Sequence, residues 1–107
     1  MTLSSHLLDA TSGRPAAGVW LSLWRQEGHD WKFVADGHTD TEGRVRDWPL
    51  TVGNHRLVFD TGGWWRDRGQ PTFHPEVVVT FTVADADAHH HVPLLLSPFS
   101  YTTYRGS

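Results

Sequence analysis

Residues 89–98 read His-His-His-Val-Pro-Leu-Leu-Leu-Ser-Pro, and residues 99–107 continue as Phe-Ser-Tyr-Thr-Thr-Tyr-Arg-Gly-Ser. In an extended strand, successive side chains point to opposite faces of the sheet. The alternation therefore places the aliphatic residues at positions 92, 94 and 96 on one face, which we expect to be buried. His90 shares this face, whereas His89 and His91 point the other way, toward solvent or a partner subunit.

Short segments of the same extended kind divide the rest of the chain, with turn residues between them. The expected strands are residues 3–8, 19–24, 31–35, 45–48, 55–60, 76–83, 89–96 and 99–103. Residues 39–44 form an expected tight turn with Gly43 at a position that needs positive φ. Residues 62–69 are the one expected helix, of about two turns, closed by a glycine. Short strands with turns between them and one brief helix indicate an all-β sandwich.

Length and composition narrow the class of protein. The 107 residues suit one domain with a single core, which we expect to span residues 1–107. A net charge of −3 and the lack of a basic stripe argue against a nucleic-acid partner. No apolar run approaches the roughly 20 residues of a membrane span, and the first residues lack a signal-peptide pattern. We therefore expect no membrane partner and a cytoplasmic location. The absence of cysteine excludes disulfides and thiol catalysis.

Eight histidines are many for a chain of this length. Histidine titrates near neutral pH and is the commonest metal ligand, so their number favours proton-transfer or metal chemistry. His89 and His91, two residues apart on one strand face, can chelate a metal, with His6 as a third ligand. No carboxylate completes a recognised ligand spacing, and a surface histidine pair is often only that. The sequence leaves a metal site as an alternative.

Two further places carry groups suited to binding an anion or a heterocycle. Arg44 follows the turn glycine, and its planar guanidinium suits a carboxylate, an enolate or an imide-like ring. Taken alone, a solvated hairpin arginine explains Arg44 as well. Residues 104–107 bring together an aromatic ring, a cation, a flexible glycine and an expected free carboxylate. Because a strand leads directly into them, we expect this segment to be docked on the fold and not frayed.

These segments resemble the 5-hydroxyisourate hydrolases, also called transthyretin-like proteins, over essentially the whole chain. The similar segments are residues 3–9, 13–19, 39–44, 59–62, 73–77, 89–98 and 104–107. The last two are the most specific. In this family the terminal Tyr-Arg-Gly-Ser separates the hydrolases from hormone-carrying transthyretin.

The resemblance implies a transthyretin-like Greek-key β-sandwich of two four-stranded sheets with one short helix. It also implies a homotetramer, a dimer of dimers with active sites at the dimer–dimer interface. The implied reaction is hydrolytic opening of 5-hydroxyisourate at the N1–C6 amide, with no cofactor and no metal. A non-catalytic transthyretin-like carrier of a small aromatic ligand is the alternative.

Functional residues also follow from the resemblance. The implied catalytic residues are His6, Arg44, His91 and Ser107, and the implied substrate-binding residues are Tyr104, Arg105 and Gly106. The strand pattern agrees, because it puts His6 among polar neighbours and His91 away from the core. His90 and His74 stand where the family usually has tyrosine. Since His90 lies on the aliphatic face, we expect a change of packing there and no loss of activity. Which catalytic histidine is the base stays open.

Overall fold

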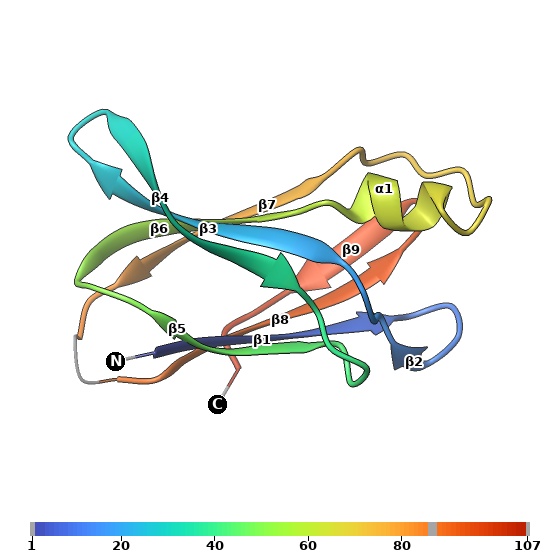
Figure 1. Cartoon of the computed structure of the whole chain (residues 1–107), viewed down its shortest axis with the longest axis horizontal. Helices are drawn as coiled ribbons and strands as arrows, with labels where there is room; N and C mark the ends of the chain where they lie inside the picture. Colours follow the sequence, from blue (N-terminus) through green and yellow to red (C-terminus); the bar gives the residue numbers. More distant parts are fainter. Residues whose placement is uncertain (1, 86–87, 107) are drawn as a thin grey trace.

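The computed structural model describes residues 2–85 and 88–106, which form two β-sheets that face one another, with a short helix near one end (Figure 1). The strands are β1 (Thr2–Asp9), β2 (Arg14–Pro15), β3 (Trp20–Glu27), β4 (Asp30–His38), β5 (Arg44–Pro49), β6 (Gly53–Phe59), β7 (Val77–Val83), β8 (His90–Ser97) and β9 (Ser100–Thr103). The helix α1 spans Thr61–Arg66. The all-β sandwich with one helix is confirmed.

The two sheets differ in how many strands they contain. One has the order β4-β3-β6-β7, and the other has the order β2-β1-β8-β9 with β5 also paired to β1. The second sheet therefore has a fifth strand beyond the four expected. This extra strand is the two-residue β2, in a segment predicted as a turn. The N–H of Gly13 donates to the Asp9 carbonyl (2.8 Å), and the tight turn leads β2 back along the end of β1.

Several element boundaries differ from those expected, most of all those of β3, which extends to Glu27, of β4 and of α1. Strand β4 is longer than residues 31–35 because it pairs with β3 over its whole length, from Trp20 opposite His38 to Glu27 opposite Asp30. Helix α1 begins at Thr61, where the Asp60 side chain accepts from the Gly63 N–H (3.2 Å). It ends at Arg66, and residues 67–69 form a separate turn after it.

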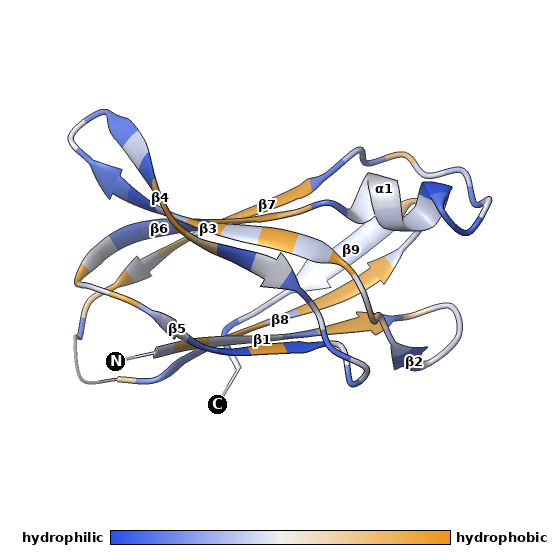
Figure 2. Ribbon diagram, viewed as in Figure 1, coloured by the Kyte–Doolittle hydropathy of each residue, from blue (hydrophilic) through white to orange (hydrophobic). Residues whose placement is uncertain are grey.

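The predicted alternation along β1 and β8 is confirmed. On β1, Leu3 and Leu7 are fully buried, and on β8, Leu94 and Leu96 are buried in the same core between the sheets. Figure 2 shows the matching hydrophobic segments on strands of both sheets. Since β1 and β8 pair in parallel, the side chains that point away from this core form one continuous outer surface.

His90 is a core residue, as expected, with only 5% of its surface exposed. Its Nδ1 lies 3.1 Å from the Ala88 carbonyl oxygen. His74 instead lies edge-on between two aromatic rings, with centroids 5.1 Å from Phe73 and 5.0 Å from Tyr101. Both histidines are therefore packed where the family usually places tyrosine. Their effect on activity stays a prediction.

A second buried histidine, His55, makes the stability of the fold sensitive to acid. It is 1% exposed and stacks on Phe81. Burial lowers the pKa of His55, and the positive charges of Arg25 and His90 lower it further. At pH values below 6.5, the ordinary pKa of histidine, His55 binds a proton more readily in the unfolded chain than in the folded protein. The free energy of unfolding therefore falls as the pH drops through this range.

We expect urea unfolding to show a smaller loss of stability between pH 7 and pH 5 in His55→Gln than in the unmodified protein, because glutamine does not titrate. His29→Gln, at the exposed β3–β4 turn, is the matched control and should keep the full pH dependence. Equal pH dependence in both variants would contradict the assignment to His55.

Candidate active site

Three of the predicted site residues come together on the outer surface of the β1-containing sheet. His6 of β1 lies opposite Arg44 of β5 and opposite Pro93 of β8. Two residues earlier on β1, Ser4 lies opposite His91. Directly opposed residues on one sheet face have side chains within contact range of one another. His6, Arg44 and His91 therefore share one small area of this surface.

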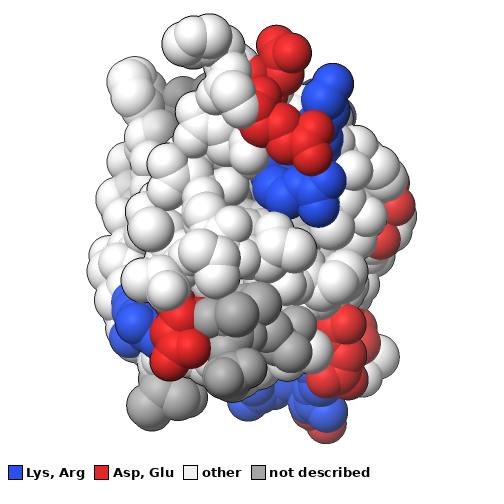
Figure 3. Space-filling model, turned by 90° about the vertical axis from the view of Figure 1, so that its left-hand side faces the viewer, with Lys and Arg blue, Asp and Glu red and all other residues white. Residues whose placement is uncertain are grey.

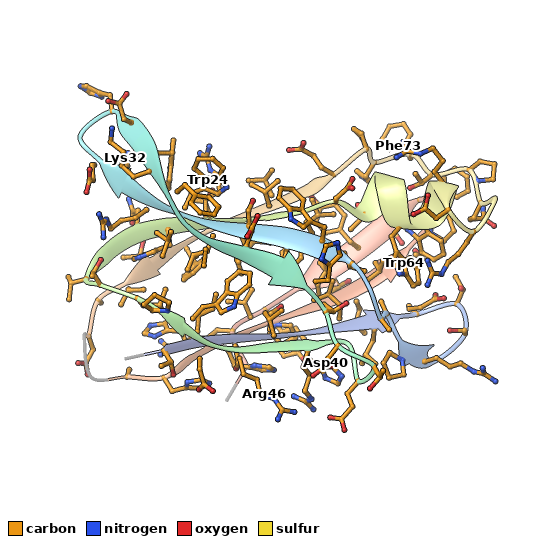
Figure 4. The ribbon with its side chains drawn as sticks, in the orientation of Figure 1. Trp24, Lys32, Asp40, Arg46, Trp64 and Phe73 are labelled. Atoms are coloured by element: carbon orange, nitrogen blue, oxygen red, sulfur yellow. The ribbon has the colours of Figure 1, made fainter. Side chains whose placement is uncertain are left out.

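A hollow of about 300 Å³ opens on this surface. Its lining residues are Ser4, Arg44, Arg46, Asp47, His89 and His91. In Figure 4, Arg46 points away from the opposite sheet, from the outer side of the layer. The hollow thus combines two guanidinium groups with two imidazoles, a set that suits an anionic, planar ligand.

The turn before β5 holds the backbone at Arg44 in place. One oxygen of Asp40, Oδ1, accepts from the backbone N–H groups of Glu42 and Arg44, both at 2.9 Å. These two hydrogen bonds lower the pKa of the Asp40 carboxyl, and the bond from the Arg44 N–H has the larger effect. Gly43 completes the turn at φ 78°, the left-handed conformation that the sequence predicted. The backbone position from which the Arg44 side chain extends is therefore fixed.

The Arg44 side chain is free to take an anion. Its Nε lies 3.9 Å from Glu42 Oε2, and the same oxygen lies 3.4 Å from Arg46 Nη2. The Glu42 side chain is 69% exposed, and exposed ion pairs of this kind contribute about 0–1 kcal/mol. An anionic ligand can therefore replace Glu42 at both guanidinium groups at little cost.

His91 is held from two sides. Its Nδ1 lies 2.7 Å from Ser4 Oγ, and the Gly106 N–H donates to its backbone carbonyl (2.8 Å). The second bond confirms that the terminal segment is docked as far as Gly106. Burial lowers the pKa of His91, and the nearby charges of Arg44, His6 and His89 lower it further. At neutral pH the ring is thus mainly uncharged, which is the form that accepts a proton.

Tyr104 and Arg105 lie on the other side of His91. They line a second hollow, of about 190 Å³, together with His90 and apolar residues of β7 and β8. The structure therefore separates Tyr104 and Arg105 from the hollow lined by Arg44, and only His91 borders both. Ser107 lies outside the described residues.

Three residues of the first hollow, Ser4, Arg46 and Asp47, were not predicted. Ser4 lies two positions before His6 on the same strand, so the alternation that selected His6 could have found it. Asp47 has no such signal. The pairing of β5 with β1 shifts between Leu3 and Ser5, and Asp47 adopts φ 62° at this β-bulge. Bulges turn a side chain toward a new direction, here toward the hollow.

The three-histidine metal cluster was the alternative left open by the sequence. Across residues 2–85 and 88–106, no group of three histidine, cysteine, aspartate or glutamate side chains is arranged to hold a metal ion. His89 and His91 instead direct a ring nitrogen each at Ser4 Oγ, at 2.9 Å and 2.7 Å. The observed geometry is that of a hydrogen-bonded chain.

Charged side chains of both signs occur on the surface (Figure 3), and helix α1 is short. On the end of the molecule seen in Figure 3, acidic and basic side chains lie next to one another, and most of the surface between them is uncharged. This is not the basic stripe of a nucleic-acid-binding surface. Among the described residues, no helix has the length and apolar character to cross a membrane.

Known proteins similar to this chain include 5-hydroxyisourate hydrolases and a transthyretin. A 5-hydroxyisourate hydrolase 2 from Rhizobium meliloti is 44% identical over 115 residues, which cover 98% of this chain and 95% of that protein. The structure of Klebsiella pneumoniae 5-hydroxyisourate hydrolase superposes with a TM-score of 0.89 at 36% identity, covering 100% of both chains. Sea bream transthyretin in complex with thyroxine gives 0.93 at 34% identity, covering 97% of this chain and 93% of the other. The family model described as HIUase/Transthyretin matches residues 3–106, and the chain belongs to this family.

Proposed function

We propose that this protein hydrolyses the N1–C6 amide of 5-hydroxyisourate. The product is 2-oxo-4-hydroxy-4-carboxy-5-ureidoimidazoline, on the route from urate to allantoin. The observation that carries the proposal is one hollow lined by both the Arg44 guanidinium and the His91 imidazole, whose Nδ1 lies 2.7 Å from Ser4 Oγ. Relatives that are similar over nearly the full chain are 5-hydroxyisourate hydrolases.

The groups on this surface supply what amide hydrolysis requires. His91 Nε2 takes a proton from water, and the resulting hydroxide oxygen adds to C6 of the substrate. The negative charge that develops on the C6 oxygen is stabilised by Arg44. The N1–C6 bond then breaks, N1 takes the proton from a histidine, and C6 becomes a carboxylic acid that releases its own proton to water. His6 is the second imidazole available for these transfers, and the chemistry needs no metal or cofactor.

We further propose that the protein is a homotetramer whose active sites lie between dimers. Among the described strands, β7 pairs only with β6 and β9 only with β8, so each leaves one edge open. Strand β7 reads Val-Val-Val-Thr-Phe-Thr-Val, without charge or proline. Such an edge readily pairs with another chain. The roles of Tyr104, Arg105 and Ser107 and the cytoplasmic location stay predictions.

Light scattering on the protein as it elutes from a size-exclusion column tests whether it forms a tetramer. The unmodified protein should elute with the mass of a tetramer. Val78→Lys places a charge on the open edge of β7, where Val78 is 39% exposed, and should yield smaller species. Val52→Lys, at a position 60% exposed in the β5–β6 turn, is the matched control. A monomeric unmodified protein would refute the assembly.

Activity is tested by generating 5-hydroxyisourate from urate with urate oxidase and following the decay of its ultraviolet absorbance. Decay that is faster with the protein present, and equally fast with a chelator, supports a metal-independent hydrolase. Since the pKa of His91 is lowered below 6.5, kcat/KM should fall only as the pH drops below that value. Decay at the spontaneous rate would refute the proposal and favour a carrier.

Gly106 provides a sharper test because it lies against the His91 ring. A Cβ atom at position 106 would lie 2.5 Å from His91 Cδ2, closer than atoms can approach. The ring must move, and a displacement of this size at a reacting group costs about 10²-fold in rate. We expect Gly106→Ala to lose activity to that extent while remaining folded. Gly37→Ala, where the nearest atom is 3.4 Å away, is the control and should stay active.

A further inference from the structure

A line of four hydrogen-bonding side chains crosses the outer surface from β1 to β8. Thr2 Oγ1 lies 3.0 Å from His89 Nδ1, and His89 Nε2 lies 2.9 Å from Ser4 Oγ. The same Ser4 oxygen lies 2.7 Å from His91 Nδ1. Both ring nitrogens of His89 are therefore engaged, and among the described residues no side chain bonds to Nε2 of His91.

The number of protons in this line restricts how it can be arranged. The Ser4 hydroxyl has one proton and can donate to only one of the two rings, so it accepts from the other. A neutral imidazole likewise carries one N–H. Only two consistent arrangements remain: every proton points from His91 toward Thr2, or every proton points the opposite way.

In the first arrangement His91 Nδ1–H donates to Ser4, Ser4 donates to His89, and His89 donates to Thr2. Nε2 of His91 then carries a free lone pair and acts as a base. In the second arrangement Nε2 carries the proton and acts as an acid. The direction of the line therefore decides which of the two roles His91 has.

We propose that Ser4 is a positioning residue that connects His91 to His89, so that the proton taken up at His91 is balanced by a charge on His89. This inference rests on the proposed hydrolase function. Ser4 and His89 differ from the site residues expected from the family resemblance, since neither was among them.

The transfer balances atom by atom. When His91 Nε2 takes a proton from water, the Nδ1 proton passes to Ser4 Oγ, and the Ser4 proton passes to His89 Nε2. Ser4 remains a hydroxyl, His91 remains neutral with its proton on Nε2, and His89 becomes an imidazolium. When His91 Nε2 later gives its proton to N1 of the substrate, the same transfers run backward and restore the starting arrangement.

The surroundings favour placing the charge on His89. His91 is half-buried, and the charged or titratable groups around it are Arg44, Arg46 and Asp47 from β5, His6 from β1, and His89. His89 is exposed to water, which solvates a charge better than a half-buried site does. The line thus lets His91 act as a base without holding a positive charge beside Arg44.

The tautomer of His91 can be observed directly, without any substrate. Nitrogen-15 NMR of histidine-labelled protein distinguishes a protonated Nδ1 from a protonated Nε2. We expect His91 in the unmodified protein to carry its proton on Nδ1, and the Ser4→Ala protein to show a mixture rich in Nε2–H. Ser4→Thr keeps a hydroxyl and should restore the original signal, while Ser97→Ala on β8 should not alter it. The His91→Asn spectrum assigns the resonances.

Kinetics provide the second readout. Ser4→Ala should lower kcat by about 10- to 100-fold, the usual effect of removing a group that orients a catalytic histidine, and Ser4→Thr should recover most of it. His89→Asn should lower kcat as well, because it removes the proton acceptor. An unchanged tautomer in Ser4→Ala, with or without a loss of kcat, would overturn the positioning role. Inactive unmodified protein would instead refute the proposed function, and the NMR result would still decide the tautomer.

Discussion

Replacing His91 by asparagine should lower kcat for 5-hydroxyisourate hydrolysis by about 10²- to 10⁴-fold, the usual contribution of a general base. Asparagine can still donate a hydrogen bond to Ser4, but it cannot take a proton from water. KM should change less, because Arg44 and Arg46 remain in place to bind the substrate. Initial rates at several substrate concentrations, with 5-hydroxyisourate formed in the cuvette, give both constants.

The matched control for this variant is His38→Asn. His38 is exposed at the end of β4, on the sheet that does not carry the hollow. It should keep the full rate, which shows that loss of a histidine in itself has no effect. If His91→Asn stayed within threefold of the unmodified rate, the base would have to be His6.

The largest loss of stability is expected from Gly43→Ala. Gly43 has φ 78°, and a Cβ atom there would lie 2.4 Å from the Leu7 carbonyl oxygen and 3.2 Å from the Ala16 nitrogen. Both are backbone atoms within paired segments and cannot turn aside. The left-handed conformation costs alanine about 1–2 kcal/mol, and overpacking adds about 1–3 kcal/mol. The free energy of unfolding should therefore fall by about 2–5 kcal/mol, measured by urea denaturation with tryptophan fluorescence.

Gly28→Ala separates the two causes. Gly28 has φ 62° but no atom within 4 Å of a Cβ at that position. Its substitution should show only the cost of the conformation, about 1–2 kcal/mol. Should Gly43→Ala lose no more stability than Gly28→Ala, the close approach to β1 would contribute nothing.

The sequence predicted the faces of the strands well because one sheet face is buried. Leu94 and Leu96 had to point inward, so His91 had to point outward, and the same reasoning placed His6. The turn at Gly43 was also readable, since only glycine adopts its conformation without strain. These are local rules, and each depends on a few neighbouring residues.

Other features depend on which strands become neighbours. Nothing in the sequence of residues 44–49 indicates that a bulge opposite Ser4 turns Asp47 toward the hollow. The separation of Arg105 from Arg44 likewise depends on how the terminal segment crosses β8. Residue patterns alone give the direction of a side chain on its own strand, and the partner strand decides what that side chain meets.

The parallel pairing of β1 with β8 also has a consequence for folding. The bond between Ser4 and His91 joins residues 87 positions apart. Contacts between distant residues form slowly, since a long loop must close before they contribute stability. On the ribosome, β1 must wait until β8 has been synthesised before the central pair of this sheet can form. An incomplete chain therefore exposes the apolar face of β1 for most of its synthesis, when it is most prone to aggregate.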